Sequence, residues 1–132
     1  DVKLKHLNDY EQRRNEVANF YDRELGNVSF LEVPERAKNS THVFHQYTIK
    51  TKGIDRDKLK SYLESKGIPT MIYYPVPLHL QTAYARAEYP AGTFPITEQL
   101  SKTVLSLPIH TEMNEEQLLY ICNTIKDFSN HA

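Results

Sequence analysis

The sequence predicts an α+β fold, a two-layer sandwich in which helices cover a small, mostly antiparallel sheet of about three strands. Three observations support this prediction. Apolar residues recur at three- and four-residue steps at both ends of the chain, which is typical of amphipathic helices. Runs of β-branched and aromatic residues, bounded by Gly and Pro, lie between them and are typical of strands. The length of 132 residues fits a single domain over residues 1–132 with a hydrophobic core.

The first elements follow from apolar spacing and from the residues that interrupt it. A helix is expected over residues 1–26, where apolar residues alternate with charged ones in helical register. It has no N-cap signal and the chain begins without Met, so we expect a piece of a longer protein. Two strands are expected next, over residues 28–33 and 42–50.

The second half alternates in the same way. Asp55 is expected to cap a helix over residues 56–66, and a third strand is expected over residues 68–74. Pro75 and Pro77 then fix an extended bend. A helix begins at Phe94-Pro95 and is expected to end at Leu105-Ser106-Leu107-Pro108. Asn114 and Gln117 form a capping-box pattern for the last helix, whose apolar stripe is Leu118, Ile121, Cys122, Ile125 and Phe128.

Composition excludes several classes of partner. The 16 Lys and Arg residues nearly balance 17 Asp and Glu, so the formal net charge is -1 and no general attraction to nucleic acid or anionic lipid is expected. No apolar run reaches the ~20 residues that a membrane-spanning helix needs. The single cysteine excludes an intrachain disulfide and suits a reducing compartment, so a cytoplasmic location is expected.

The histidines, the cysteine, the serines and the lysines give little indication of a metal site or of a catalytic nucleophile. His42 and His45 are three apart, and in a strand they would point to opposite faces, so no metal site is expected. Cys122 falls on an apolar helix stripe, where a thiol is a poor nucleophile. No G-x-S-x-G motif and no glycine-rich phosphate loop is present. A lysine forms a Schiff base readily only when it is desolvated, and four lysines lie instead among polar helical neighbours: Lys58, Lys60, Lys66 and Lys102.

The most unusual segment runs from Ile72 to Gln81. Tyr73 and Tyr74 end the expected third strand and lead into a proline loop that presents His79 and Gln81. Tyrosines offer a flat face and a hydroxyl, which suit sugars and nucleotides, and rigid loops at strand ends are common binding sites. Physical reasoning leaves a binding loop and a packed corner equally open.

Five motifs in this order carry a resemblance to a known family. They are Arg56-Asp57-x-Leu59 followed by Leu63, Gly67-Ile68-x-Thr70, Tyr74-Pro75-x-Pro77-Leu78-His79-x-Gln81, Phe94-Pro95 and Leu105-Ser106-Leu107-Pro108. Together they resemble the C-terminal region of the DegT/StrS-type sugar aminotransferases, pyridoxal-phosphate enzymes of the aspartate aminotransferase fold. The resemblance extends over nearly all of the chain.

The resemblance implies that the chain is the small C-terminal domain of a larger enzyme. In that family the large N-terminal domain holds the pyridoxal 5'-phosphate (PLP) and the Schiff-base lysine, so no catalytic residue, no cofactor and no metal is expected on this chain. The parent enzyme would be a homodimer that transfers an amino group, usually from glutamate, to a keto nucleotide sugar. Such enzymes serve cell-surface polysaccharide or secondary-metabolite sugar synthesis. The chain alone is expected to be inactive.

The resemblance also implies five substrate-binding residues. The histidine aligned with His45 faces the cofactor and substrate side of the cleft in the family, and the loop that carries Tyr73, Tyr74, His79 and Gln81 lies near the sugar nucleotide at the subunit boundary. The commoner family motif is Ile-His-Tyr-Pro, so Tyr73 replaces a histidine here. This form of the loop is similar to that of members acting on 3-keto nucleotide sugars such as UDP-linked hexuronic acids.

Two alternatives stand beside the enzyme fragment. The chain would be a standalone module that binds a nucleotide sugar or a partner with the same fold, or a structural domain whose tyrosine-rich loop only packs. Saturable binding of a UDP-sugar that is lost in Tyr74→Ala would favour the module.

Overall fold

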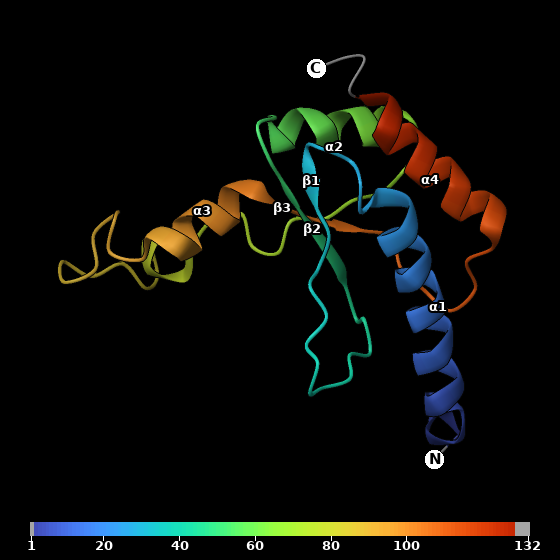
Figure 1. The fold of residues 1–132 in the computed structure, drawn as a ribbon. Coiled ribbons are helices and arrows are strands. Elements are labelled where there is room, and N and C mark those ends of the chain that lie inside the picture. The colour runs from blue at the N-terminus through green and yellow to red at the C-terminus, as the bar shows by residue number, and fades with distance from the viewer. Residues whose placement is uncertain (1, 129–132) are drawn as a thin grey trace.

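The computed structural model describes residues 2–128 and confirms the α+β class, with helices and a small antiparallel sheet (Figure 1). Along the chain the elements are η1 (Lys3–His6), α1 (Leu7–Leu25), β1 (Leu31–Glu32), β2 (Tyr47–Thr51), α2 (Arg56–Ser65), η2 (Leu78–Leu80), α3 (Pro95–Thr103), β3 (Val104–Leu107) and α4 (Glu115–Asp127). η1 and η2 are short 3₁₀ turns.

The helices begin where local chemistry predicts. Asp55 accepts hydrogen bonds from the backbone N–H groups of Asp57 and Lys58 at the start of α2. Asn114 and Gln117 form the expected reciprocal capping box at the start of α4. The first helix is shorter than the expected 1–26, because η1 precedes it and α1 begins only at Leu7. Asp1 lies outside the described residues.

The sheet has the order β1-β2-β3, with both pairs antiparallel. Tyr47 lies opposite Leu107, and Ile49 lies opposite Leu105. All four side chains are buried, and they face α1, α2 and α4 in the second layer of the sandwich. The alternate residues, such as Thr48 and Ser106, lie on the other face of the sheet.

The core lies between this face of the sheet and the three helices. Its largest completely buried side chains come from α1, β2, α2, β3 and α4: Tyr21, Leu25, Tyr47, Ile49, Leu59, Leu63, Leu105, Cys122 and Ile125. The apolar stripe expected on the last helix is confirmed, since all five of its residues are buried.

The first two strands lie in the expected segments but are shorter. Only Leu31–Glu32 of residues 28–33 pairs with β2. The expected strand over 42–50 begins only at Tyr47, because Phe44 has a φ of +47° and turns the chain out of the extended conformation. The His42 Nδ1 accepts the Phe44 N–H at 2.9 Å and holds this turn.

The third strand was expected in the wrong place. Residues 68–74 form no strand, and only Met71 bridges to Ser106. Pro69 and Pro75 lack the N–H groups that a continuous ladder needs. The third strand is β3, Val104–Leu107, which was expected to be the end of a helix. It follows α3 without a loop, so its short apolar run resembles a continuation of that helix.

Residues 75–103 form a projection that we call the arm. It consists of the proline loop, η2, an irregular turn and α3, and it extends to the side of the sheet away from α1 and α4 (Figure 1). Pro95 occupies the first turn of α3, as expected.

Candidate functional site

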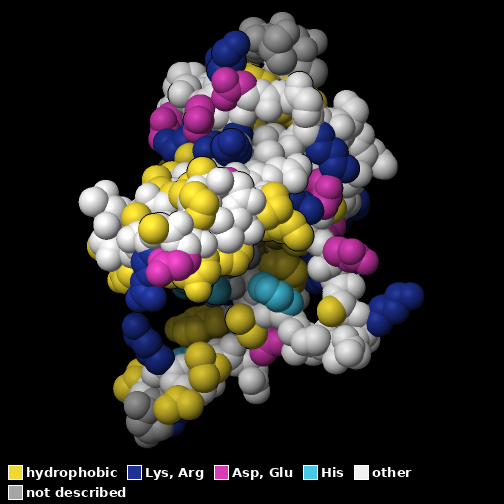
Figure 2. Space-filling view, turned by 90° about the vertical axis from the view of Figure 1, so that its left-hand side faces the viewer, with side chains coloured by type: hydrophobic (Ala, Val, Ile, Leu, Met, Phe, Trp, Pro, Cys, Tyr) yellow, Lys and Arg dark blue, Asp and Glu magenta, His cyan; other side chains and the backbone are white. Residues whose placement is uncertain are grey.

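The five predicted site residues lie on three separate segments. His45 precedes β2, Tyr73 and Tyr74 follow the Met71 bridge, and His79 and Gln81 belong to the arm. Two grooves bring most of them together, and Tyr73 lines both. Figure 2 shows hydrophobic side chains gathered over the arm, with histidines in the hollow beside it.

The first groove lies at the edge of the sheet and has a volume of about 220 Å³. His45 and Tyr73 lie on its walls, together with Thr70 and Ser106. The Ser106 hydroxyl is already 2.8 Å from that of Thr48. The Thr70 hydroxyl is buried and has no hydrogen-bond partner among the described residues. The sheet-edge groove therefore presents an imidazole, a phenol and an unpaired hydroxyl close together.

Arg14 sets the position of His45, although sequence reasoning did not identify it. From α1, its guanidinium Nη1 donates to the carbonyls of Phe44 at 2.9 Å, His45 at 3.2 Å and Ile109 at 3.3 Å. The sequence did contain a signal. Arg14 stands three to four residues from Tyr10 and Val17, on the apolar stripe of the helix, where a charged residue needs a polar partner.

The second groove lies between the proline loop and α3, and its volume is about 660 Å³. Tyr73 and Tyr74 form one side, and Thr97, Leu100 and Ser101 of α3 form the other. Tyr74 is 73% exposed and Tyr73 is 44% exposed, so both residues can meet a ligand or another chain. Their rings are nearly perpendicular at 6.1 Å, across a cis peptide bond.

Gln81 and His79 are held by the arm itself. Gln81 lines the groove between the loop and α3, but its Nε2 donates to the Val76 carbonyl at 3.1 Å. The side chain of His79 is only 9% exposed, and its Nε2 lies 3.1 Å from a Glu98 oxygen on α3. The structure therefore brings His45, Tyr73, Tyr74 and Gln81 to the grooves and turns His79 inward.

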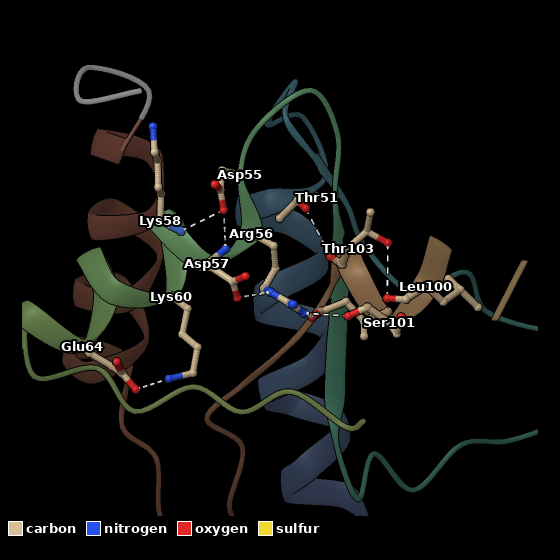
Figure 3. Close-up of polar contacts among 11 residues, drawn as sticks. Thr51, Asp55, Arg56, Asp57, Lys58, Lys60, Glu64, Leu100, Ser101 and Thr103 are labelled. Atoms are coloured by element: carbon tan, nitrogen blue, oxygen red, sulfur yellow. Dashed lines mark hydrogen bonds and ion pairs between the residues drawn. The ribbon is translucent and has the colours of Figure 1, made fainter. Parts of the chain in front are cut away.

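Arg56 fixes the base of the arm (Figure 3). Its side chain is 7% exposed, and Nη1 donates to the Ser101 carbonyl at 3.2 Å and to the Val104 carbonyl at 2.8 Å. Thr51 donates to the neighbouring Thr103 carbonyl at 3.2 Å. The last carbonyls of a helix lack partners within it, and a cation there is favourable. The Arg56 in the first motif is thus a structural residue that joins α2 to α3.

Three buried titratable groups outside the grooves, Tyr21, Tyr47 and Cys122, are poorly suited to proton transfer. Burial raises the pKa of Tyr21 and of Tyr47 far above the usual range for tyrosine, and both hydroxyls are hydrogen-bonded, to the Pro108 carbonyl and to Asp22. Burial also raises the pKa of Cys122 to about 12. Over residues 2–128, no three His, Cys, Asp or Glu side chains come close enough to hold a metal ion. What the grooves offer is hydrogen bonding and aromatic contact, which suit binding of a polar, hydroxyl-rich ligand.

Comparisons with known proteins agree on one family. A profile of the DegT/DnrJ/EryC1/StrS aminotransferase family matches residues 1–126. A "Pleiotropic regulatory protein" of Geobacillus stearothermophilus is 39% identical over 98% of this chain and 35% of its own length. A "UDP-N-acetyl-3-dehydro-alpha-D-glucosamine 3-aminotranferase" of Acidithiobacillus ferrooxidans is 38% identical over 92% of this chain and 31% of its own length.

A solved structure gives the same likeness in three dimensions. The S. venezuelae DesV, crystallised in complex with a ketimine intermediate, superposes with a TM-score of 0.92 at 33% identity. The match covers 99% of this chain and 35% of that one. The chain therefore spans about a third of the length of the proteins it matches.

Proposed function

The chain belongs to the DegT/DnrJ/EryC1/StrS aminotransferase family, and on that premise we propose that it is the C-terminal small domain of a PLP-dependent enzyme acting on a nucleotide sugar. The parent enzyme transfers an amino group from glutamate to a keto nucleotide sugar. The observation that carries this proposal is that nearly the whole chain matches only about a third of the length of its relatives. The other two-thirds of each relative's length is enough to hold a separate large domain.

The position aminated is proposed from the relatives. The Acidithiobacillus ferrooxidans protein is named as a 3-aminotransferase of a 3-dehydro UDP-sugar, and the tyrosine form of the loop supports the same choice here. We assign the 3-keto position of a nucleotide sugar as the site of amination. Cell-surface polysaccharide or secondary-metabolite synthesis is the setting that fits such a product.

Direct contact with the sugar is assigned to the side chains that the grooves expose. Tyr73 and Tyr74 offer phenol hydroxyls and ring faces, and His45 offers an imidazole at the sheet-edge groove. Tyrosine is neutral at pH 7, so Tyr73 would donate or accept a hydrogen bond without bringing charge to the sugar. His79 and Gln81 belong to the same site through the loop that they hold.

We propose that this chain holds no PLP site of its own. A PLP enzyme needs a desolvated lysine and a phosphate cradle. Here Lys60 forms an ion pair with Glu64, Lys66 lies over the Tyr62 ring, and Lys58 and Lys102 are exposed on helices. PLP is therefore assigned to the large domain of the parent, where it supplies the electron sink for amino transfer. No step at the cofactor is assigned to this chain.

The arm is the proposed contact surface of the parent enzyme. Many of its large apolar side chains are exposed, among them Val76, Leu78, Tyr84, Tyr89, Phe94 and Ile96. An apolar surface of this kind marks a site of protein contact. We assign it to the large domain of the same polypeptide and to the second subunit of a homodimer. Between residues 2 and 128, none of the helices combines the length and apolar character needed to cross a membrane. A cytoplasmic location is proposed because the single cysteine suits a reducing compartment.

The test begins with the whole gene. Its reading frame should extend upstream of Asp1 and encode a Schiff-base lysine, and the purified full-length protein should aminate a 3-keto UDP-sugar with glutamate as donor. Tyr74→Ala should raise the KM for the sugar without removing the PLP absorbance band. A full-length protein that binds PLP but aminates no keto nucleotide sugar would contradict the proposal.

The isolated chain separates the enzyme fragment from a standalone binding module. We expect no aldimine absorbance on addition of PLP and no saturable calorimetric signal with UDP-N-acetylglucosamine. An aldimine band abolished by a single lysine substitution would place the cofactor on this chain. Saturable sugar binding that is lost in Tyr74→Ala would favour the standalone module instead.

A further inference from the structure

A single carboxylate holds the irregular part of the arm against α3. The Glu98 Oε1 accepts the backbone N–H of Gly92 at 2.8 Å and that of Phe94 at 3.3 Å, and Oε2 lies 3.0 Å from the same Gly92 nitrogen. Phe94 is the N-cap residue of α3 and its side chain makes no cap hydrogen bond. The Glu98 carboxylate, four residues later, accepts the backbone N–H of this N-cap residue, at the end of the helix where negative charge is favoured.

The same carboxylate reaches the other side of the arm. His79, from η2, places its Nε2 3.1 Å from Glu98 Oε1. The Phe94 ring packs edge-on against the imidazole, with 4.9 Å between ring centroids. Glu98, His79 and the two backbone N–H groups of Gly92 and Phe94 thus form a closed set of contacts, which we call the clasp. It joins three segments that are up to 19 residues apart in the sequence.

Hydrogen bonds between η2 and the proline loop connect the clasp to Tyr74. η2 is held to the proline loop by Gln81, whose amide donates to the Val76 carbonyl, two residues after Tyr74. The Leu80 N–H also donates to the Pro77 carbonyl at 2.9 Å. α3, which carries Glu98, forms the opposite wall of the groove lined by Tyr74. Both walls of this groove therefore depend on the contact between η2 and α3.

We propose that Glu98 is a positioning residue that, through His79, closes the arm and holds Tyr74 at the distance from α3 needed for the nucleotide sugar. This inference rests on the proposed function for the identity of the ligand, but the clasp itself does not. Glu98 touches no substrate in this assignment. His79 acts with it as a support for the loop and makes no contact with the sugar.

Amide hydrogen exchange followed by NMR tests the clasp in the isolated chain. Glu98→Gln keeps the shape of the side chain but removes its charge and turns an acceptor into an N–H₂ donor. Exchange at the Gly92 and Phe94 amides should rise at least about tenfold, because hydrogen bonds to a charged acceptor are among the stronger ones. Glu88→Gln is the matched control, since Glu88 is exposed in the same arm and has no ion pair or hydrogen bond among residues 2–128. It should leave both amides unchanged.

The NMR resonances of the Tyr74 ring distinguish a positioning role from a merely structural contact, which would leave them unchanged. Its ring resonances should shift in Glu98→Gln and in His79→Phe, and return close to the starting values in His79→Gln, which restores an N–H donor. The amides of β2 and α4 monitor the core in every variant and should not change. Unaltered exchange at Gly92 and Phe94 would overturn the clasp, and altered exchange with unmoved Tyr74 resonances would overturn the positioning role.

The full-length enzyme separates this inference from the proposed function. There, Glu98→Gln should raise the KM for the nucleotide sugar about tenfold or more with a smaller change in kcat, as expected when binding geometry is lost. If the full-length protein proves not to aminate a nucleotide sugar, the exchange and resonance results above still decide whether the clasp exists. An unchanged KM in an enzyme that does aminate one would overturn the role assigned to Glu98.

Discussion

Replacing Arg56 by Met tests how the arm is anchored to the domain. Met keeps much of the apolar stem but removes the guanidinium that bonds the Ser101 and Val104 carbonyls. A hydrogen bond to a charged group contributes about 1.5–3 kcal/mol, and a cation at a helix C-terminus about 0.3–1 kcal/mol. The bond to Asp57 adds less than about 1 kcal/mol, because that carboxylate is 73% exposed.

Both carbonyls share the single Nη1 donor, so the two bonds are counted once. The terms together then predict a loss of about 3 kcal/mol in the free energy of unfolding. For a chain of this size that corresponds to a fall in Tm of about 10–15 °C. Urea unfolding followed by circular dichroism measures it, and the slope with urea should be unchanged. Arg56→Lys should lose about 1–2 kcal/mol, because an ammonium is a point charge without the planar fork.

Lys58→Met provides the control, since it removes the same charge from the same helix. The Lys58 side chain points away from the cluster around Arg56 (Figure 3). Its substitution should change stability by less than about 0.5 kcal/mol. If the free energies of unfolding of Arg56→Met and Lys58→Met differ by less than about 1 kcal/mol, the anchoring role of the guanidinium is refuted.

Three further predictions follow from the described contacts. Cys122, whose pKa burial raises to about 12, should resist a thiol reagent at pH 8 and react fully in urea; fast reaction in the native chain would contradict its burial. Asn114→Ala should cost about 1 kcal/mol in urea unfolding by removing the capping box, whereas Asn123→Ala should not. Burial would raise the pKa of Glu98, but the hydrogen bonds from Gly92, His79 and Phe94 outweigh it and leave that pKa below its usual value. The clasp is therefore complete above the ordinary glutamate pKa of about 4.3, and it is lost as the pH falls through the lower pKa that Glu98 has in the folded chain. The amide resonances of Gly92 and Phe94 should report this loss before the core unfolds. Amide resonances that do not respond to acid would contradict the prediction.

The helices were largely predictable because their boundary signals are local. Asp55 and Asn114 each cap within three residues, and Pro95 occupies the first turn of its helix whatever the rest of the chain does. The position of the third strand was not predictable in this way. Ile68 to Tyr74 has the residue types of a strand, but β2 pairs with Val104–Leu107, and that choice depends on a contact between segments more than 50 residues apart. Tertiary pairing overrides local strand propensity.

In the candidate site, too, local features could be predicted from the sequence and features that depend on distant segments could not. Tyr73 and Tyr74, which the loop motif singles out, lie at exposed positions on a groove. Their contact with a sugar stays a prediction. The inward turn of His79 could not be read from the same motif, because its partner Glu98 lies on α3, beyond a loop without periodic pattern. Arg14 was missed for a similar reason, since its carbonyl partners come from two distant segments.

The edges of the sheet limit how copies of this domain can meet. β1 has only two paired residues, and its Glu32 is flanked by ion pairs with Lys50 and Lys52. On the other side, Met71 covers the outer edge of β3 by bridging to Ser106. Long unpaired edges are templates on which further strands add without limit, and short or charged ones are not. Molecules that meet through the apolar arm should therefore form finite, dissociable complexes held by side chains, and not growing fibres held by backbone ladders.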